Sequence, residues 1–174
     1  MTDQGKTKRR QLLKSAGALS ALGALAALES PTAAFAQNTN AGQGPVGSWL
    51  YTVTATSPSG PPSTVLGLET YAAGGGYVET DQFSFMHSSL ATPGHGSWKS
   101  TGERTFLLTY LNLSYDTQGT PQGTTKIRQV ATLNQAGDSY SGSGNFDVYD
   151  VQGNVILSGT FTITATRIRV ETPS

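Results

Sequence analysis

The sequence predicts an all-β protein, a single antiparallel eight-stranded up-and-down barrel after an N-terminal signal peptide. Thr, Val, Tyr and Gly dominate the chain after residue 37, and no segment there keeps a helical apolar period beyond a turn or two. Strand-like runs recur at short intervals, with turn residues between them. Closing the sheet into a barrel removes the two exposed edges that an open eight-stranded sheet would keep.

The strands are bounded by turn chemistry. The eight runs span residues 48–56, 64–71, 76–81, 95–101, 105–115, 124–134, 138–150 and 154–170. Gly, Pro, Asn and Asp punctuate them at residues 58–62, 74–76, 102–103, 118–121, 136–138 and 152–154. Only residues 82–94 form a longer connection, and the short links elsewhere predict an antiparallel meander.

The last run shows the strand alternation most clearly. Every second residue from Thr160 to Thr166 is threonine, and the residues between them are apolar or small. We therefore expect the threonine row to face water and the row containing Phe161 to face the barrel interior. Arg167 continues the apolar row, so it needs a partner at the end of the barrel.

The N-terminal residues have the composition of an export signal. A basic segment contains Arg9-Arg10, residues 15–28 are rich in Ala and Leu, and Ala34-Phe35-Ala36 fits a signal-peptidase site. The segment resembles twin-arginine signals, although Lys8 and Leu12 depart from the usual motif. The cleavage pattern and the polar residues after it predict a signal peptide over residues 1–36, a linker over 37–45 and a barrel over 46–174. The resemblance implies a prokaryotic export machinery as partner and a periplasmic or extracellular location.

The full chain has no net charge, but it becomes mildly acidic when the predicted signal is removed. The signal carries five Lys or Arg and two Asp or Glu, which leaves six basic and nine acidic residues. A mildly acidic chain without a basic stripe argues against nucleic-acid binding. The chain has no cysteine, so thiolate metal sites and disulfides are excluded.

A Gly-x-Trp motif stands at the head of the first predicted strand. Gly47-Ser48-Trp49, with Arg167 near the end of the last strand, resembles the lipocalin and wider calycin barrels. In that family an arginine lies over the tryptophan and closes one end, so the resemblance gives Trp49 and Arg167 a structural role. A second resemblance, to allene-oxide-cyclase and dirigent barrels, rests on the glycine-rich residues 141–146 and 158–161.

The long connection is unusually apolar for a loop. It contains Phe83, Phe85, Met86 and His87, and we expect it to fold over one barrel mouth as a lid. His95 and Trp98 follow directly and are expected near the same opening.

The residues expected to contact a ligand come from this mouth and from the predicted strands. They are Tyr51, Phe85, Met86, Trp98, Tyr110 and Phe161. Both rows of residues 105–115 are apolar, which leaves the side of Tyr110 open.

The candidate acid–base groups are few. They are His87, His95, Glu69, Glu79 and Asp81. Leu66, Leu68 and Val78 make the opposite row the more apolar one, so we expect the carboxylates to face solvent. If they faced inward instead, burial would raise their pKa values and suit them to proton transfer.

The function follows by elimination. No nucleophile, phosphate-loop or dinucleotide motif is present, and two histidines eight residues apart do not suggest a metal site. We therefore expect no cofactor and no metal. The favoured hypothesis is a secreted barrel that binds a small apolar molecule in its lumen. The alternatives are a cofactor-free cyclase or isomerase of allene-oxide-cyclase or dirigent type, and a filled barrel that acts through its surface.

Overall fold

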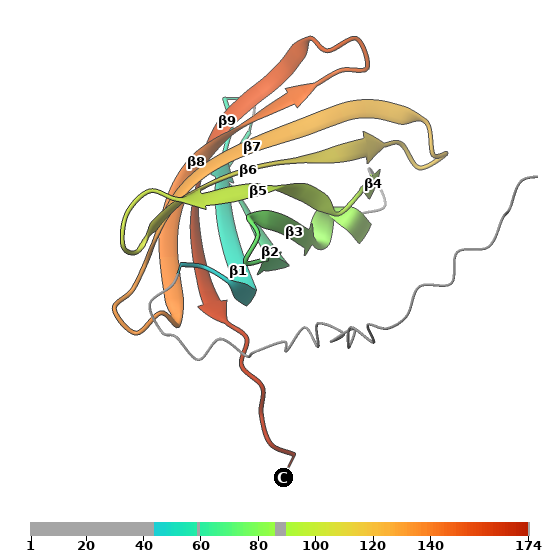
Figure 1. Ribbon diagram of the computed structural model, residues 1–174. Helices are drawn as coiled ribbons and strands as arrows, with labels where there is room; N and C mark the ends of the chain where they lie inside the picture. The colour runs from blue at the N-terminus through green and yellow to red at the C-terminus, as the bar shows by residue number, and fades with distance from the viewer. Residues whose placement is uncertain (1–43, 59, 86–89, 174) are drawn as a thin grey trace, which may run out of the picture. The chain divides into compact units, whose positions relative to one another are not determined.

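The computed structural model describes residues 44–58, 60–85 and 90–173, with the backbone alone for Phe85. The signal and most of the linker lie outside this range. The described residues form nine strands and a short 3₁₀ helix (Figure 1). The strands are β1 (Gly47–Thr56), β2 (Ser63–Tyr71), β3 (Gly76–Asp81), β4 (Leu90–Ala91), β5 (Gly94–Ser100), β6 (Thr105–Tyr115), β7 (Pro121–Leu133), β8 (Ser139–Tyr149) and β9 (Val155–Arg167), and the 3₁₀ helix is η1 (Gln82–Phe85).

The strands close into the expected eight-stranded antiparallel barrel. Every pair is antiparallel, in the order β1–β2–β3–β5–β6–β7–β8–β9, and β9 pairs with β1 to complete the circle. The ninth strand, β4, is a two-residue pairing with the far end of β6. The closure fixes the register, because Trp49 stands opposite Arg167 and Tyr51 opposite Ala165.

The barrel has two different ends. The β6–β7 and β8–β9 hairpins lie on the right of Figure 1 together with η1 and β4. The β5–β6 and β7–β8 turns lie on the left, at the same end as the start of β1 and the end of β9. We call the first the open end and the second the closed end.

Three of the hairpins share one turn design. A residue with a side-chain oxygen begins each turn and a glycine with positive φ stands three positions later, as in Asp150 and Gly153 (φ 87°). The Asp150 carboxylate accepts hydrogen bonds from the backbone N–H groups of Gln152 and Asn154, both at 2.8–2.9 Å. Asp116 with Gly119 and Asn134 with Gly137 repeat the arrangement. This explains why the turns were visible in the sequence.

The strand predictions agree with the structure to within a few residues at each end. In β9, Phe161, Ile163 and Ala165 are buried and the threonine row is exposed, as expected. The long connection contains η1 and β4. Among the described residues, no helix is long and apolar enough to cross a membrane.

Candidate functional site

The closed end is sealed by Trp49 and Arg167. The Arg167 guanidinium lies 4.1 Å from the Trp49 ring centroid, and the indole is fully buried. The indole N–H donates to the Pro45 carbonyl at 2.8 Å, while Arg167 donates to the carbonyls of Gly137 and Val46. The expected contact between these two side chains is therefore present, and backbone carbonyls hold both of them in place at this end.

Above this seal, aromatic rings fill the closed half of the barrel around one carboxylate. Tyr71 packs edge-on against Phe106 at 5.3 Å and tilted against Tyr77 at 4.9 Å, measured between ring centroids. The Glu69 carboxylate lies among them and is only 3% exposed. It accepts hydrogen bonds from the hydroxyls of Tyr77 (2.9 Å), Tyr71 (3.3 Å) and Tyr140. Burial raises the pKa of Glu69 to about 7, although these three hydroxyls act to lower it.

A second carboxylate lies toward the middle of the barrel. Glu79 faces Glu69 across the β2–β3 ladder and accepts a hydrogen bond from the Tyr51 hydroxyl at 2.9 Å. Burial, together with the neighbouring Asp81, raises the pKa of Glu79 to about 7. The Tyr51 hydroxyl and the backbone N–H of Gly94 oppose that shift. Burial also raises the pKa of Tyr51, so its hydroxyl stays a hydrogen-bond donor.

These positions correct the outward orientation expected for the carboxylate row. Glu69 and Glu79 face the interior, whereas Leu66 and Leu68 are 52% and 54% exposed on the outer wall. The physical reason lies in the tyrosines, because their hydroxyls satisfy the buried carboxylates that an apolar interior could not. Tyr71 and Tyr77 occupy the same alternating row as the glutamates, so these two aromatic residues were the feature of the sequence that indicated an inward-facing row.

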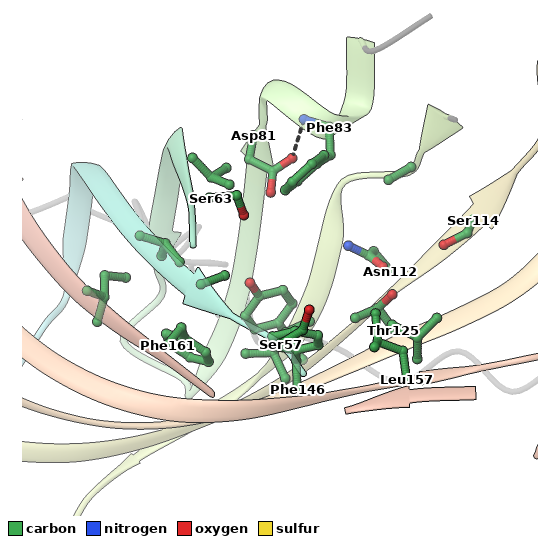
Figure 2. A pocket seen from close by; sticks show the side chains of 18 of the residues that line it. Ser57, Ser63, Asp81, Phe83, Asn112, Ser114, Thr125, Phe146, Leu157 and Phe161 are labelled. Atoms are coloured by element: carbon green, nitrogen blue, oxygen red, sulfur yellow. Dashed lines mark hydrogen bonds between the residues drawn. The ribbon is translucent and has the colours of Figure 1, made fainter. Parts of the chain in front are cut away.

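A cavity of about 460 Å³ occupies the open half of the barrel. Figure 2 shows Phe146, Leu157 and Phe161 on one side of it and Asp81 with Phe83 on the other. Apolar side chains make up most of the wall, namely Val53, Ala55, Pro61, Val65, Phe83, Leu90, Ala91, Ile127, Phe146, Val148, Leu157, Phe161 and Ile163. The polar lining groups are Tyr51, Ser57, Ser63, Asp81, Tyr110, Asn112, Ser114, Thr125 and Gln129.

Glycines on the inner wall make room for the rings that bound this cavity. A Cβ on Gly67 would overlap the Tyr51 ring, and one on Gly144 would lie 2.5 Å from the Phe161 ring. The outer atoms of each ring therefore occupy space beside a glycine of the neighbouring strand that any larger residue would fill.

The structure brings together only part of the predicted ligand-contact set. Tyr51, Tyr110 and Phe161 all line the cavity. Trp98 does not, which corrects its expected place at the mouth. Its indole donates to the Ala72 carbonyl at 2.9 Å and contacts Tyr71 at the closed end. The physical reason is that this indole lies on β5 beside the β2–β3 turn, whose carbonyl satisfies its N–H.

The predicted lid is only partly described. Phe83 in η1 lines the cavity, and its N–H donates to Asp81 at 2.8 Å (Figure 2). Met86, His87 and the side chain of Phe85 lie outside the described residues. His95 is exposed and pairs with Val78 and Leu111, whose side chains are on the outer wall. The His95 side chain therefore lies on the outer wall, so it cannot act as an acid or base in the lumen.

Three further lining residues were not among those predicted from the sequence. Asn112, Gln129 and Phe146 contact the cavity, and the two amides each contain a buried atom without a hydrogen-bond partner among the described residues. Their strands have mixed rows, so alternation alone did not identify the inward face. Within the described part of the chain, no group of three or more His, Cys, Asp or Glu residues is placed to hold a metal ion.

Comparison with known proteins does not identify a family for this chain. No family model matches the sequence, and no curated protein matches it either. Among solved structures, the S-type phycobiliprotein lyase CPES from Guillardia theta is similar, with 9% sequence identity and a TM-score of 0.38. The match covers 72% of this chain and 89% of the lyase chain. A similarity this low does not extend to function.

Proposed function

We propose that this chain is an exported β-barrel that binds a small, largely apolar molecule in the cavity at its open end. The single observation that carries the proposal is the cavity of about 460 Å³, with mostly apolar walls and a few polar groups. Its volume lies within the range of about 300–1,000 Å³ typical of small-molecule sites. A barrel that acted only through its surface would need no such space.

The aromatic filling of the closed half supports the same proposal. Tyr71, Phe106 and Tyr140 occupy the closed half as one edge-packed cluster, and Trp49 with Arg167 seals the end below them. A ligand would therefore enter from the open end and rest on Tyr51 and Tyr110, which lie at the depth where the cavity meets the core.

Two neighbouring residues of β1 provide a matched test. Ala55 lines the cavity and Thr54 is exposed on the outer wall. Ala55→Phe should fill part of the cavity and weaken binding of 1-decanol at least about tenfold, which corresponds to about 1.4 kcal/mol. Thr54→Phe adds a similar ring outside and should leave the affinity unchanged in isothermal titration calorimetry. Equal affinities for both variants would place the site elsewhere, and no binding to the wild type would remove the proposal.

The Asp81, Glu79 and Tyr51 group favours a second candidate, a cofactor-free cyclase or isomerase. Asp81 and Tyr51 line the cavity, and Tyr51 connects it by one hydrogen bond to Glu79. A carboxyl whose pKa is raised to about 7 can exchange a proton near neutral pH. In this candidate the Glu79 carboxyl holds the exchangeable proton. The Tyr51 hydroxyl links that carboxyl to the ligand through hydrogen bonds, and the apolar wall holds the substrate in a folded conformation.

The two candidates differ in what purifies with the protein. A binding protein should carry the same small molecule in the wild type and in Glu79→Gln. An enzyme should carry its product in the wild type and unreacted substrate in the variant. Chromatographic retention and tandem mass spectra of the extracted molecule distinguish these outcomes, and an unfolding curve confirms that Glu79→Gln is folded.

We also propose the finer family assignment and the route of export. The Gly47-x-Trp49 motif with its stacked Arg167 supports a lipocalin-like, calycin-type barrel, with allene-oxide-cyclase and dirigent barrels as the alternative. The basic and apolar segments of residues 1–36 support export through a twin-arginine pathway, cleavage after Ala36 and a periplasmic or extracellular location.

A further inference from the structure

The cavity wall carries charge of one sign. Asp81 is the one charged side chain among the described lining residues, and that set contains no Lys, Arg or His. The Asp81 carboxylate accepts the Phe83 N–H and forms no ion pair with a described residue. Glu79 lies two residues away on β3, in the same row, and adds negative charge above its pKa of about 7.

Two amide groups in the same wall have hydrogen-bonding capacity left over. Gln129 is only 5% exposed, and its Nε2 has no hydrogen-bond partner among the described residues. It lies close to the Tyr140 hydroxyl, where it opposes the rise that burial causes in the pKa of that group. The buried Oδ1 of Asn112 is likewise without a partner in the described part of the chain. Buried polar groups usually find a partner in the protein, in water or in a ligand. The unpartnered Asn112 Oδ1 is an acceptor and calls for a donor on the occupant, whereas the Gln129 Nε2–H calls for an acceptor, which water or a hydroxyl can supply.

We propose that the ligand of this cavity carries a hydrogen-bond donor without negative charge, with an amine favoured most, an alcohol next and a carboxylate least. The inference rests on the proposed function, because it concerns the occupant of the same cavity. A carboxylate placed here would lie near Asp81 in a largely apolar wall with no described cation to offset the repulsion. An ammonium group would pair with Asp81, and a hydroxyl could donate to it.

Three probes with one tail test this order. Decylamine, 1-decanol and decanoic acid share the alkyl chain and differ in the charge of the head group. We expect decylamine to bind about tenfold or more tightly than decanoate in calorimetry at about pH 8. Asp81→Asn should bring the two affinities to within about threefold of each other, since it removes the charge and keeps an oxygen for the Phe83 N–H.

Glu103→Gln is the matched control. Glu103 is exposed in the β5–β6 turn at the closed end, and the substitution changes the net charge of the chain by the same amount. The preference for decylamine should therefore persist in this variant. Far-UV circular dichroism and a urea midpoint show that both variants are folded.

The possible outcomes distinguish a failure of this inference from a failure of the proposed function. If 1-decanol binds but decanoate binds as tightly as decylamine, or if Asp81→Asn leaves the preference intact, the inference is wrong and a lumen-binding barrel remains. If the preference is lost equally in Glu103→Gln, net charge explains it and the inference is also wrong. If none of the three probes binds, the proposed function fails together with the inference.

Discussion

At the scale of single residues, Glu69 makes the stability of the barrel depend on pH. Burial raises its pKa from 4.5 to about 7, so the native state keeps a proton that the unfolded chain has already released. The free energy of unfolding should then fall as pH rises from about 4.5 to about 7, and level off above that. Glu79 has a pKa raised to the same value and acts in the same direction.

Glu69→Gln should remove its part of this dependence. The shift corresponds to about 3 kcal/mol between the two limits, because one pKa unit is about 1.4 kcal/mol. Urea midpoints measured at pH 5 and pH 8 should differ less in the variant than in the wild type, whereas Glu103→Gln should behave like the wild type. A wild type that is more stable at pH 8 than at pH 5 would contradict the assigned direction.

The closing pair of side chains gives a second prediction at this scale. Trp49→Ala should destabilise the barrel by about 3–5 kcal/mol, because it empties a fully buried site. Arg167→Ala should cost less, and the double variant should cost less than the sum by about 1 kcal/mol, because both side chains share one stacked contact. Additive free energies of unfolding would show that the contact contributes nothing.

At the scale of the elements, the hairpin turns depend on glycine backbone geometry. Gly153 has a φ of 87° and open space around the position of a Cβ, so Gly153→Ala tests the backbone alone. It should destabilise by about 1 kcal/mol. Gly74 also has open space but lacks a positive φ, so Gly74→Ala should change the unfolding free energy by less than about 0.5 kcal/mol. Equal effects would mean that packing, rather than φ, decides the cost.

The strands could be predicted because the turns that bound them are encoded by residues close together in the sequence. Asp150 and Gly153 define a turn within four residues, and the threonine row of β9 fixes its inner face without knowledge of the other strands. The orientation of β2 and β3 could not be obtained in this way. Leu68 is the more apolar choice for burial, but the interior already contains tyrosines from distant strands that stabilise Glu69.

The same limit applies to the candidate site. Tyr51, Tyr110 and Phe161 were all expected to contact a ligand, and all three line the cavity. The threonine row of β9 identified the inner face for Phe161, whereas both rows of β6 are apolar and did not decide the side of Tyr110. The predicted position of Trp98 was wrong. Its place at the closed end depends on a carbonyl of the β2–β3 turn that accepts the indole N–H, and this contact between distant segments is not visible in the sequence.

At the scale of the whole molecule, export remains a separate prediction. Replacing both Arg9 and Arg10 by Lys should keep the precursor in the cytoplasm, because a paired arginine is the defining feature of twin-arginine signals. Immunoblots of cell fractions measure this, and N-terminal sequencing of the exported wild type should begin at Gln37. Normal export of the variant would exclude the proposed route.

The division of the barrel into a filled half and an open half is what links fold to function. The aromatic cluster around Glu69 and the stacked Arg167 seal one end, and the cavity of about 460 Å³ opens at the other. A ligand in that cavity would contact the wall that carries Ala55, while the outer residue Thr54 would remain in solvent.

Native mass spectrometry of the protein purified from its own host tests this claim most directly. We predict a small molecule bound one to one to the wild type and to Thr54→Phe, and its absence from Ala55→Phe. A spectrum containing only the unliganded barrel, or the same added mass on Ala55→Phe, would contradict binding in the lumen.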